Sequence, residues 1–160
     1  MKLLLVAVGR LKAGPERELV ARYAERCVAS GRKIGFTGFE MREIDESRAR
    51  RPEDRKAEEA ASIFGQLPSQ TKIICLDERG RALSSEDFAK KLGDWRDSGA
   101  GGCAVVIGGP DGLDPSLREK ADLTLAFGAM TWPHQIVRAL AAEQIFRAMT
   151  ILSGHPYHRV

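Results

Sequence analysis

The sequence predicts an α/β fold, with a mostly parallel sheet and helices on both faces, in a single domain that spans residues 1–160. Two observations carry this prediction. Short, almost continuous apolar segments alternate with longer amphipathic ones, which is the pattern of parallel strands joined by crossover helices. The chain also has the length of one ordinary domain, and it contains no linker, internal repeat or low-complexity segment.

The first predicted unit is a strand, a helix and a second strand. Residues 2–8 form an apolar run of the kind found in strands buried on both faces. A helix should begin at Pro15, because proline suits the first helical turn, and it should continue to residue 31. Residues 34–44 are apolar enough for a strand, although two glycines interrupt them.

The next segment is dominated by charge. Between residues 41 and 60, Arg, Lys, Asp and Glu are intermixed and outnumber all other residue types. From Pro52 to about residue 67 the spacing predicts a helix with a charged outer face and an apolar inner one. Residues 71–76 should form a buried strand that a turn at residues 77–80 closes.

The second half of the chain repeats the alternation of strands and helices. Its glycine-rich and proline-containing segments mark the turns between them. The predicted elements are a helix capped by Ser84 or Ser85 that runs through Trp95, a strand at 103–107, a turn at 108–112, a short helix after Pro115, a strand at 123–127 and a helix from 131 to 152.

Composition excludes several classes of protein. Lys and Arg number 25 against 22 Asp and Glu, and this net charge of +3 is too small to indicate nucleic-acid binding by itself. No segment approaches the ~20 apolar residues of a membrane span, and the first apolar run is too short for a signal peptide. Three cysteines without Cys-x-x-Cys spacing predict reduced thiols and a cytoplasmic protein.

Common catalytic and metal-binding motifs do not occur. No Gly-x-Gly-x-x-Gly follows the first predicted strand, and the Gly9 to Gly14 segment continues into Pro15 rather than into the Lys of a phosphate-binding loop. There is no G-x-S-x-G elbow and no H-E-x-x-H. His155 and His158 supply only two possible ligands, so no metal site is predicted.

Three predicted strand ends run into loops of small residues, at 76–77, 108–112 and 125–130. Ligands of open α/β sheets bind at the carboxyl ends of the strands. Glycine in such a loop lets a ligand approach backbone N–H and C=O groups without a side chain in the way. These loops are therefore the predicted binding site. The alternative interpretation of residues 108–112 is an ordinary strand-ending turn, which Gly, Pro and Asp favour.

All three histidines, His134, His155 and His158, lie near the C-terminus. Histidine changes its charge near neutral pH, so this grouping indicates proton chemistry or phosphate contact. The alternative is an exposed helix start followed by a solvated tail.

The helix predicted at residues 131–152 has a wider apolar stripe than a single core face requires. This width predicts that part of the helix packs on a second copy of the chain. Arg138, early in the helix, should face either solvent or a polyanion.

Four ordered motifs resemble one known family. They are V-I-G-G-P-D-G-L at 106–113, M-T-W-P-H-Q at 130–135 followed by V-R at 137–138, A-E-Q at 142–144 and H-P-Y-H-R at 155–159. They are similar to the RlmH family of small SPOUT-class methyltransferases, which modify the N3 position of a pseudouridine in bacterial 23S ribosomal RNA. The opening M-K-L fits as well, so the likeness spans essentially the whole chain. Trp132 departs from the family pattern, which usually has a smaller apolar residue there.

The resemblance implies a SPOUT-type fold with a C-terminal trefoil knot, a homodimer, and S-adenosyl-L-methionine as the methyl donor. It implies no metal, because the sulfonium leaving group is already activated. Carried over position by position, the cofactor contacts fall on the loops at the strand ends. They are Leu76, Gly108, Gly109, Leu125, Ala126, Phe127, Gly128, Ala129 and Met130.

The resemblance also suggests how the substrate is held. We expect five residues to hold the flipped nucleotide and its phosphates near the methyl group, with the identity of any general base left open. Phosphate contacts largely set affinity for RNA, and the charge surplus of +3 is small. Assembled ribosomal particles should therefore be a better substrate than naked RNA. The five residues are His155, Tyr157, His158, Arg159 and Arg138.

Two other functions stay open on the sequence. In a non-catalytic RNA-binding α/β module the strand-end loops would be turns only, and the protein would not bind S-adenosylmethionine. A small nucleotide-dependent enzyme, such as a nucleotidyl transferase, is disfavoured because the sequence has neither a phosphate loop nor an acidic metal cluster.

Overall fold

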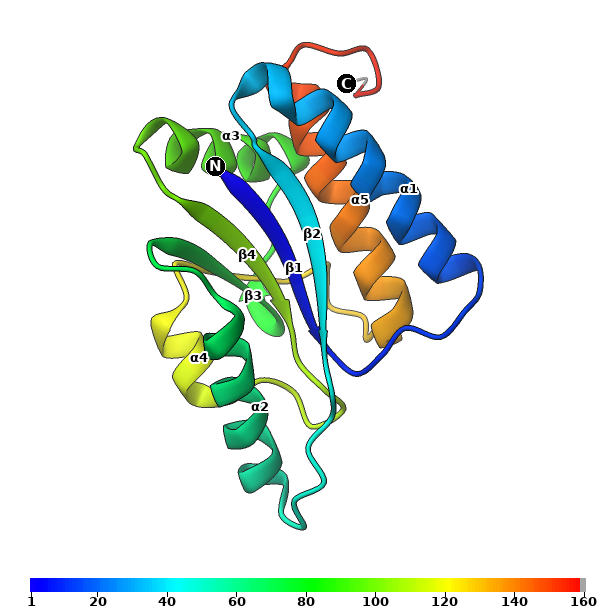
Figure 1. Ribbon diagram of the computed structural model, residues 1–160, viewed down its shortest axis with the longest axis vertical. Coiled ribbons are helices and arrows are strands. Elements are labelled where there is room, and N and C mark those ends of the chain that lie inside the picture. The colour runs from blue at the N-terminus through cyan, green and yellow to red at the C-terminus, as the bar shows by residue number, and fades with distance from the viewer. Residues whose placement is uncertain (159–160) are drawn as a thin grey trace.

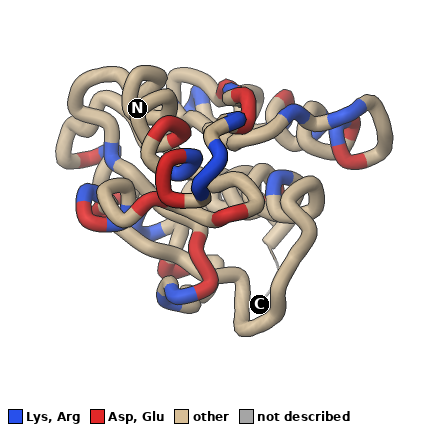
Figure 2. Tube along the Cα trace, turned by 90° about the horizontal axis from the view of Figure 1, so that it is seen from below, with Lys and Arg blue, Asp and Glu red and all other residues tan. Residues whose placement is uncertain are grey.

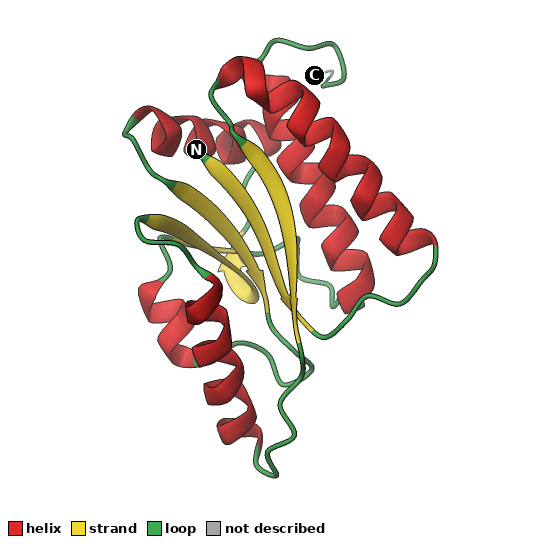
Figure 3. Cartoon of the chain, viewed as in Figure 1, coloured by secondary structure: helices red, strands yellow, loops and turns green. Residues whose placement is uncertain are grey.

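The protein, described here from a computed structural model that covers residues 1–158, is a five-stranded parallel sheet with helices on both faces (Figures 1 and 3). The predicted α/β class is confirmed. The strand order is β2-β1-β4-β3-β5. In chain order the elements are β1 (Lys2–Val8), α1 (Pro15–Gly31), η1 (Arg32–Ile34), β2 (Gly38–Ile44), α2 (Pro52–Gln66), β3 (Thr71–Arg81), α3 (Ser85–Asp97), β4 (Gly102–Ile107), α4 (Pro115–Lys120), β5 (Leu123–Leu125) and α5 (His134–Leu152).

Side chains of the central strands alternate between two apolar cores. On β1, Leu3 and Leu5 belong to the core under α1, α3 and α5, whereas Leu4 and Val6 belong to the core under α2 and α4. The figures show these two groups of helices on opposite faces of the sheet (Figure 1). Because both faces of the strand are buried, its sequence reads as a continuous apolar run. None of the helices formed by residues 1–158 is long and apolar enough to cross a membrane.

The three cysteines are separate and buried. Cys27, Cys75 and Cys103 are all free thiols, as their number and spacing predicted. Burial raises the pKa of Cys27 to about 12 and that of Cys75 to about 11. At neutral pH these thiols are therefore protonated, which makes them packing residues rather than nucleophiles.

The second strand is shorter than the sequence predicted. Residues Arg32–Ile34 form a 3-10 turn, and Gly35 follows with a φ of 84°. This left-handed conformation ends the helical segment and redirects the chain into β2. The apolar residues at 34 and 36 thus belong to the corner before the strand, and only Gly38–Ile44 pair with β1.

The third strand is longer than predicted, because no closing turn forms at residues 77–80. β3 runs on to Arg81, and an irregularity after Leu76 lets Arg81 pair with Leu125 of β5. Gly80 makes this close approach possible: a Cβ there would lie 2.5 Å from the Leu125 carbonyl carbon. β5 itself stops at Leu125, so residues 126 and 127 belong to the following loop.

Helix α5 packs between α1 and α3 within one chain. Ala139 and Ala142 face α1, while Ile145 and Met149 belong to the core that α3 closes. Two helical neighbours and the sheet together explain the wide apolar stripe of this helix. The stripe alone therefore does not require a second copy of the chain.

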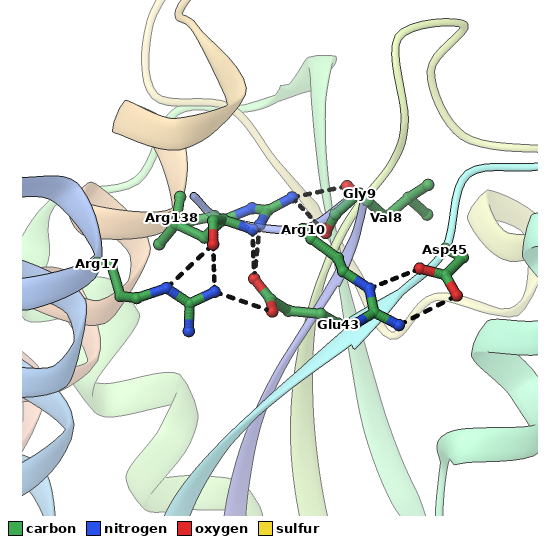
Figure 4. Close-up of polar contacts among 8 residues, drawn as sticks. Val8, Gly9, Arg10, Arg17, Glu43, Asp45 and Arg138 are labelled. Carbon is green, nitrogen blue, oxygen red and sulfur yellow. Dashed lines mark hydrogen bonds and ion pairs between the residues drawn. The ribbon is translucent and has the colours of Figure 1, made fainter. Parts of the chain in front are cut away.

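Arg138 is buried, and it joins α5 to the ends of β1 and β2 (Figure 4). Its side chain is only 3% exposed, and its Nη2 donates to the carbonyls of Val8 at 2.7 Å and Gly9 at 3.0 Å. Its Nη1 lies 3.2 Å from Oε1 of Glu43. Arg17 of α1 also contacts this carboxylate, at 3.3 Å. The expectation that Arg138 faces solvent or a polyanion is therefore wrong, because β-strand carbonyls occupy its guanidinium.

Replacing Arg138 should destabilise the fold. Arg138→Met would leave Glu43 and two carbonyls without their buried partner, which costs about 3 kcal/mol of unfolding free energy. Urea denaturation measures this loss. Arg10→Gln is the matched control, because it breaks the Arg10–Asp45 pair, whose side chains are 75% and 73% exposed. Its urea midpoint should stay at the wild-type value. Equal midpoints for both variants would contradict the role given to Arg138.

A methyl group at Gly80 should also be destabilising, because the Leu125 backbone occupies its place. We expect Gly80→Ala to lower the unfolding free energy by about 1–3 kcal/mol. Gly65→Ala serves as the control, since Gly65 lies in α2 with no atom within 4 Å of the added carbon. That change should stabilise the helix by up to about 1 kcal/mol. Thermal unfolding of the two variants separates these effects, and an unaltered Gly80→Ala protein would refute the close contact.

Candidate functional site

A cavity of about 410 Å³ opens at the carboxyl edge of the sheet, within the range typical of small-molecule sites. The loops that follow β4 and β5 line it, together with the extension of β3 and the first turn of α5. Figure 2 looks at the molecule from below, onto the end where the strands of Figure 1 finish. The parallel strands thus bring together three segments that are distant in sequence.

The cavity wall contains the expected cofactor residues with one exception. Ala129 does not line it, although its neighbours Gly128 and Met130 do. The loops after β4 and β5 and the extension of β3 meet at this one cavity, at the edge of the sheet where the sequence predicted a binding site. The expected residues that line it are Leu76, Gly108, Gly109, Leu125, Ala126, Phe127, Gly128 and Met130.

Two of these glycines pack closely against other parts of the protein. A Cβ on Gly108 would lie 2.8 Å from the carbonyl carbon of Gly112, and one on Gly109 would lie 3.0 Å from Oε2 of Glu59. Their missing side chains therefore make room for the protein itself. Gly128 is the open one: its φ is 100°, and no atom lies within 4 Å of a Cβ built there.

Charged side chains of both signs form part of the wall, and most of them lie outside the loops that the sequence predicted as the binding site. Arg118 lies 3.1 Å from Asp77 and donates to the Leu113 carbonyl at 2.9 Å. Asp77 and Asp111 lie in the predicted strand-end loops, and His134 is one of the three candidate histidines. The lining residues that the sequence did not indicate include Lys56, Glu78, Arg79, Arg118 and Trp132.

The loop between β5 and α5 exposes two large apolar side chains at the cavity. Met130 is 76% exposed and Trp132 is 41% exposed. The Trp132 indole donates to the Phe127 carbonyl at 3.3 Å, so the ring closes the loop on itself. His134 is exposed at the start of α5, as the alternative interpretation predicted, and it also forms part of the cavity wall.

The described tail residues do not reach the cavity of their own chain. In Figure 1 the chain that follows α5 lies, as far as it is described, at the opposite end of the sheet from the carboxyl ends of the strands. His155 is exposed, and its Nδ1 accepts from the Tyr157 amide at 3.1 Å. His158 lies 2.7 Å from Glu86 at the start of α3. Arg159 falls outside the described residues.

Tyr157 is held against the second half of α5. Its ring meets that of Phe146 edge-on at 4.8 Å, the Arg147 guanidinium lies 5.1 Å from its centroid, and its hydroxyl lies 3.2 Å from Glu143. Burial, with contributions from Tyr23 and Glu143, raises the pKa of Tyr157 to about 12. The phenol is therefore neutral at physiological pH, which suits hydrogen bonding rather than proton abstraction.

The site can bind a small polar molecule through main-chain groups and charges of both signs. Within residues 1–158, no three His, Cys, Asp or Glu side chains gather in an arrangement that could hold a metal ion. Of the five residues expected to hold the substrate, Tyr157 contacts Glu143 of α5, His158 contacts Glu86 of α3, and Arg138 contacts the Val8 carbonyl. None of the four that the structure describes lines the cavity of its own chain.

Known proteins of one family match this chain over essentially its full length. A family model described as "Predicted SPOUT methyltransferase" matches residues 1–158. The ribosomal RNA large subunit methyltransferase H of Methylorubrum populi is 58% identical over 160 residues, covering 99% of this chain and 97% of that protein. The protein of the same name from Rhizobium etli is 56% identical and covers 100% of both chains.

A third relative agrees with these two. The ribosomal RNA large subunit methyltransferase H of Bradyrhizobium sp. is 57% identical over 159 residues, covering 99% of this chain and 98% of that protein. Among solved structures, the SpoU methyltransferase AviRb from Streptomyces viridochromogenes has a TM-score of 0.42 at 12% identity, over 96% of this chain and 60% of that one. On the family model and the curated relatives, this chain belongs to the SPOUT methyltransferase family, in the group of the ribosomal RNA large subunit methyltransferases H.

Proposed function

We propose that this protein uses S-adenosylmethionine to methylate the N3 position of a pseudouridine in bacterial 23S ribosomal RNA. The observation that carries the proposal is the convergence of the loops after β4 and β5 with the extension of β3 on one cavity, in a chain of the SPOUT methyltransferase family. The names of the relatives place their activity on the RNA of the large ribosomal subunit. A ribosomal substrate also supports a cytoplasmic location.

The cavity suits the chemistry of the cofactor. S-adenosylmethionine carries an ammonium, a carboxylate and a sulfonium beside its adenosine, and the wall offers Lys56 and Arg79 as cations and Asp77 and Glu78 as anions. Main-chain groups of the loops after β4 and β5 would hold the adenine and ribose. When bound, the cofactor supplies a methyl group that the sulfonium already activates for transfer.

The protein contributes position and proton handling. Methyl transfer to a ring nitrogen requires the donor and the nucleophile in line, and the N3 proton must leave. We assign the nucleotide and its phosphates to the tail residues His155, Tyr157, His158 and Arg159. Tyr157 acts in this scheme as a hydrogen-bond donor, because its raised pKa keeps the phenol protonated. Arg138 supports the site from below by holding the end of β1.

A homodimer would resolve the separation between tail and cavity. The described tail residues lie at the opposite end of the sheet from the cavity of their own chain, and Met130 and Trp132 beside that cavity are 76% and 41% exposed. A second copy would cover these side chains and supply its own tail to the substrate. The trefoil knot expected of the C-terminal segment remains a prediction in this proposal.

Ribosomal particles should be methylated far faster than naked RNA. The net charge of +3 provides few cations for phosphate contact, so an assembled subunit must add shape complementarity. The measurement is transfer of labelled methyl groups to purified particles and to extracted 23S RNA, with mass mapping of the modified nucleotide. Equal rates on both substrates would refute the preference for particles. Absence of heat on titration with S-adenosylmethionine would favour a non-catalytic RNA-binding module.

Removing the tail should separate substrate handling from cofactor binding. A chain that ends at Ser153 keeps every residue of the cavity wall, so its affinity for S-adenosylmethionine should stay near the wild-type value. Its methylation of ribosomal particles should be abolished. Calorimetry and methyl transfer measure the two properties. His158→Gln, which leaves Tyr157 packed on α5, is the milder variant. It should lose methylation of ribosomal particles and keep its affinity for S-adenosylmethionine. Loss of cofactor binding in either protein would contradict this division of roles.

A further inference from the structure

The charged segment at residues 41–60 has a feature that the cavity does not use. Between β2 and α2 the chain forms an extended loop, residues 45–51, which we name the arm. The arm projects below the carboxyl edge of the sheet in Figure 1, on the same side as the cavity. Arg48, Arg50 and Arg51 are all exposed on it.

The base of the arm is fixed by hydrogen bonds to α2. The Ser47 amide donates to Oε1 of Glu59 at 3.0 Å, and the Ser47 hydroxyl donates to Glu58. Glu59 is only 5% exposed, and burial raises its pKa. A loop with this many contacts to a helix presents its outward side chains without a large ordering cost on binding.

Arg55 joins the arm to the wall of the cavity. Its Nη1 donates to the carbonyls of Ala49 at 3.1 Å and Arg50 at 3.0 Å. Its Nε and Nη2 hold both carboxylate oxygens of Asp111, at 2.6 and 3.0 Å. Asp111 lines the cavity, as does Lys56, the next residue of α2. The Arg55 side chain therefore bridges the backbone of the arm and the loop that follows β4.

Two charged side chains of the arm, Arg51 and Asp45, are neutralised by ion pairs, whereas Glu46, Arg48 and Arg50 form none within the described residues. Arg51 pairs with Asp54 at 2.8 Å, and Asp45 pairs with Arg10 at 2.7 Å. Within residues 1–158, neither Arg48 nor Arg50 forms an ion pair. Two exposed guanidiniums on a fixed loop have the geometry for phosphate oxygens, which arginine binds through two parallel hydrogen bonds.

We propose that the arm is an RNA-contact surface, in which Arg48 and Arg50 bind backbone phosphates of the ribosomal RNA next to the nucleotide that enters the cavity. This inference rests on the proposed function, and it names a surface of the protein that the cavity and the tail do not include. The Arg55–Asp111 pair would keep these phosphate contacts in register with the cofactor loop. The contacts carry no base specificity, so they would position the substrate rather than select it.

The test is the double variant Arg48→Gln/Arg50→Gln, assayed on ribosomal particles. We expect KM for the particles to rise at least about 5-fold with kcat nearly unchanged, and the slope of log affinity against log salt to become shallower by about 1 to 2. Affinity for S-adenosylmethionine, measured by calorimetry, should equal that of the wild type. Both side chains are exposed, so the thermal midpoint should not move.

Arg32→Gln/Lys33→Gln is the matched control. It removes the same formal charge from two exposed residues that form no ion pair within residues 1–158, and it does so in η1, at the opposite end of the sheet. The control should keep the wild-type KM and salt slope. An equal loss in the control would show an effect of net charge and would overturn the proposal.

The remaining outcomes are equally decisive. A wild-type KM in the arm variant, with an active wild-type enzyme, overturns the arm alone and leaves the methyltransferase function standing. A raised KM with an unchanged salt slope would point to a ribosomal protein as the partner and would also overturn it. An inactive wild-type enzyme that binds no cofactor contradicts the proposed function itself. The single variants Arg48→Gln and Arg50→Gln give the same answer if the double variant unfolds.

Discussion

The parallel pairing of β1 with β2 on one side and β4 on the other is the constraint on which the rest of the molecule depends. Leu3 pairs with Phe39 across one ladder and with Cys103 across the other. Parallel strands need crossover connections, and the helices of those connections bury both faces of the sheet. All five strands therefore finish at one edge, where the loops after β4 and β5 and the extension of β3 form the cavity.

Two arginines stabilise this edge in different ways. Arg138 is buried, and it satisfies the last carbonyls of β1 while it meets Glu43 at the end of β2. Arg55 is partly exposed, and it links the arm to Asp111 in the loop after β4. The Arg55 guanidinium, which donates hydrogen bonds to Asp111, holds the pKa of that carboxyl below its usual range. Arg138 holds the carboxyl end of β1, and Arg55 connects the arm to the cavity wall through Asp111.

The glycines of the loop after β4 and the aromatic tail show that the same residue type can either contact a ligand or pack against its own chain. A sequence motif does not distinguish these two uses. Gly108 and Gly109 occur in the loop of the cofactor site, yet the space above their Cα atoms belongs to Gly112 and Glu59. The tail has the aromatic and basic residues expected of a nucleotide contact, yet Tyr157 packs on Phe146 of its own chain. In both cases the residue type indicated a possible ligand contact, and the neighbouring residues in the fold determined what the residue packs against.

Sequence by itself determined the parts of the fold that depend on local pattern. The buried strands, the helix start at Pro15, the Ser84 cap of α3 and the three strand-end loops all follow from apolar spacing and backbone preference within a few residues. Motif resemblance added the family and the cofactor.

Tertiary structure alone decided the features that need residues from distant parts of the chain. The extension of β3 depends on Gly80 meeting Leu125, and the burial of Arg138 depends on carbonyls of β1. Lys56 enters the cavity wall because α2 packs beside the loop after β4. No local pattern contains such information, because a side chain's exposure is set by what the rest of the fold places against it.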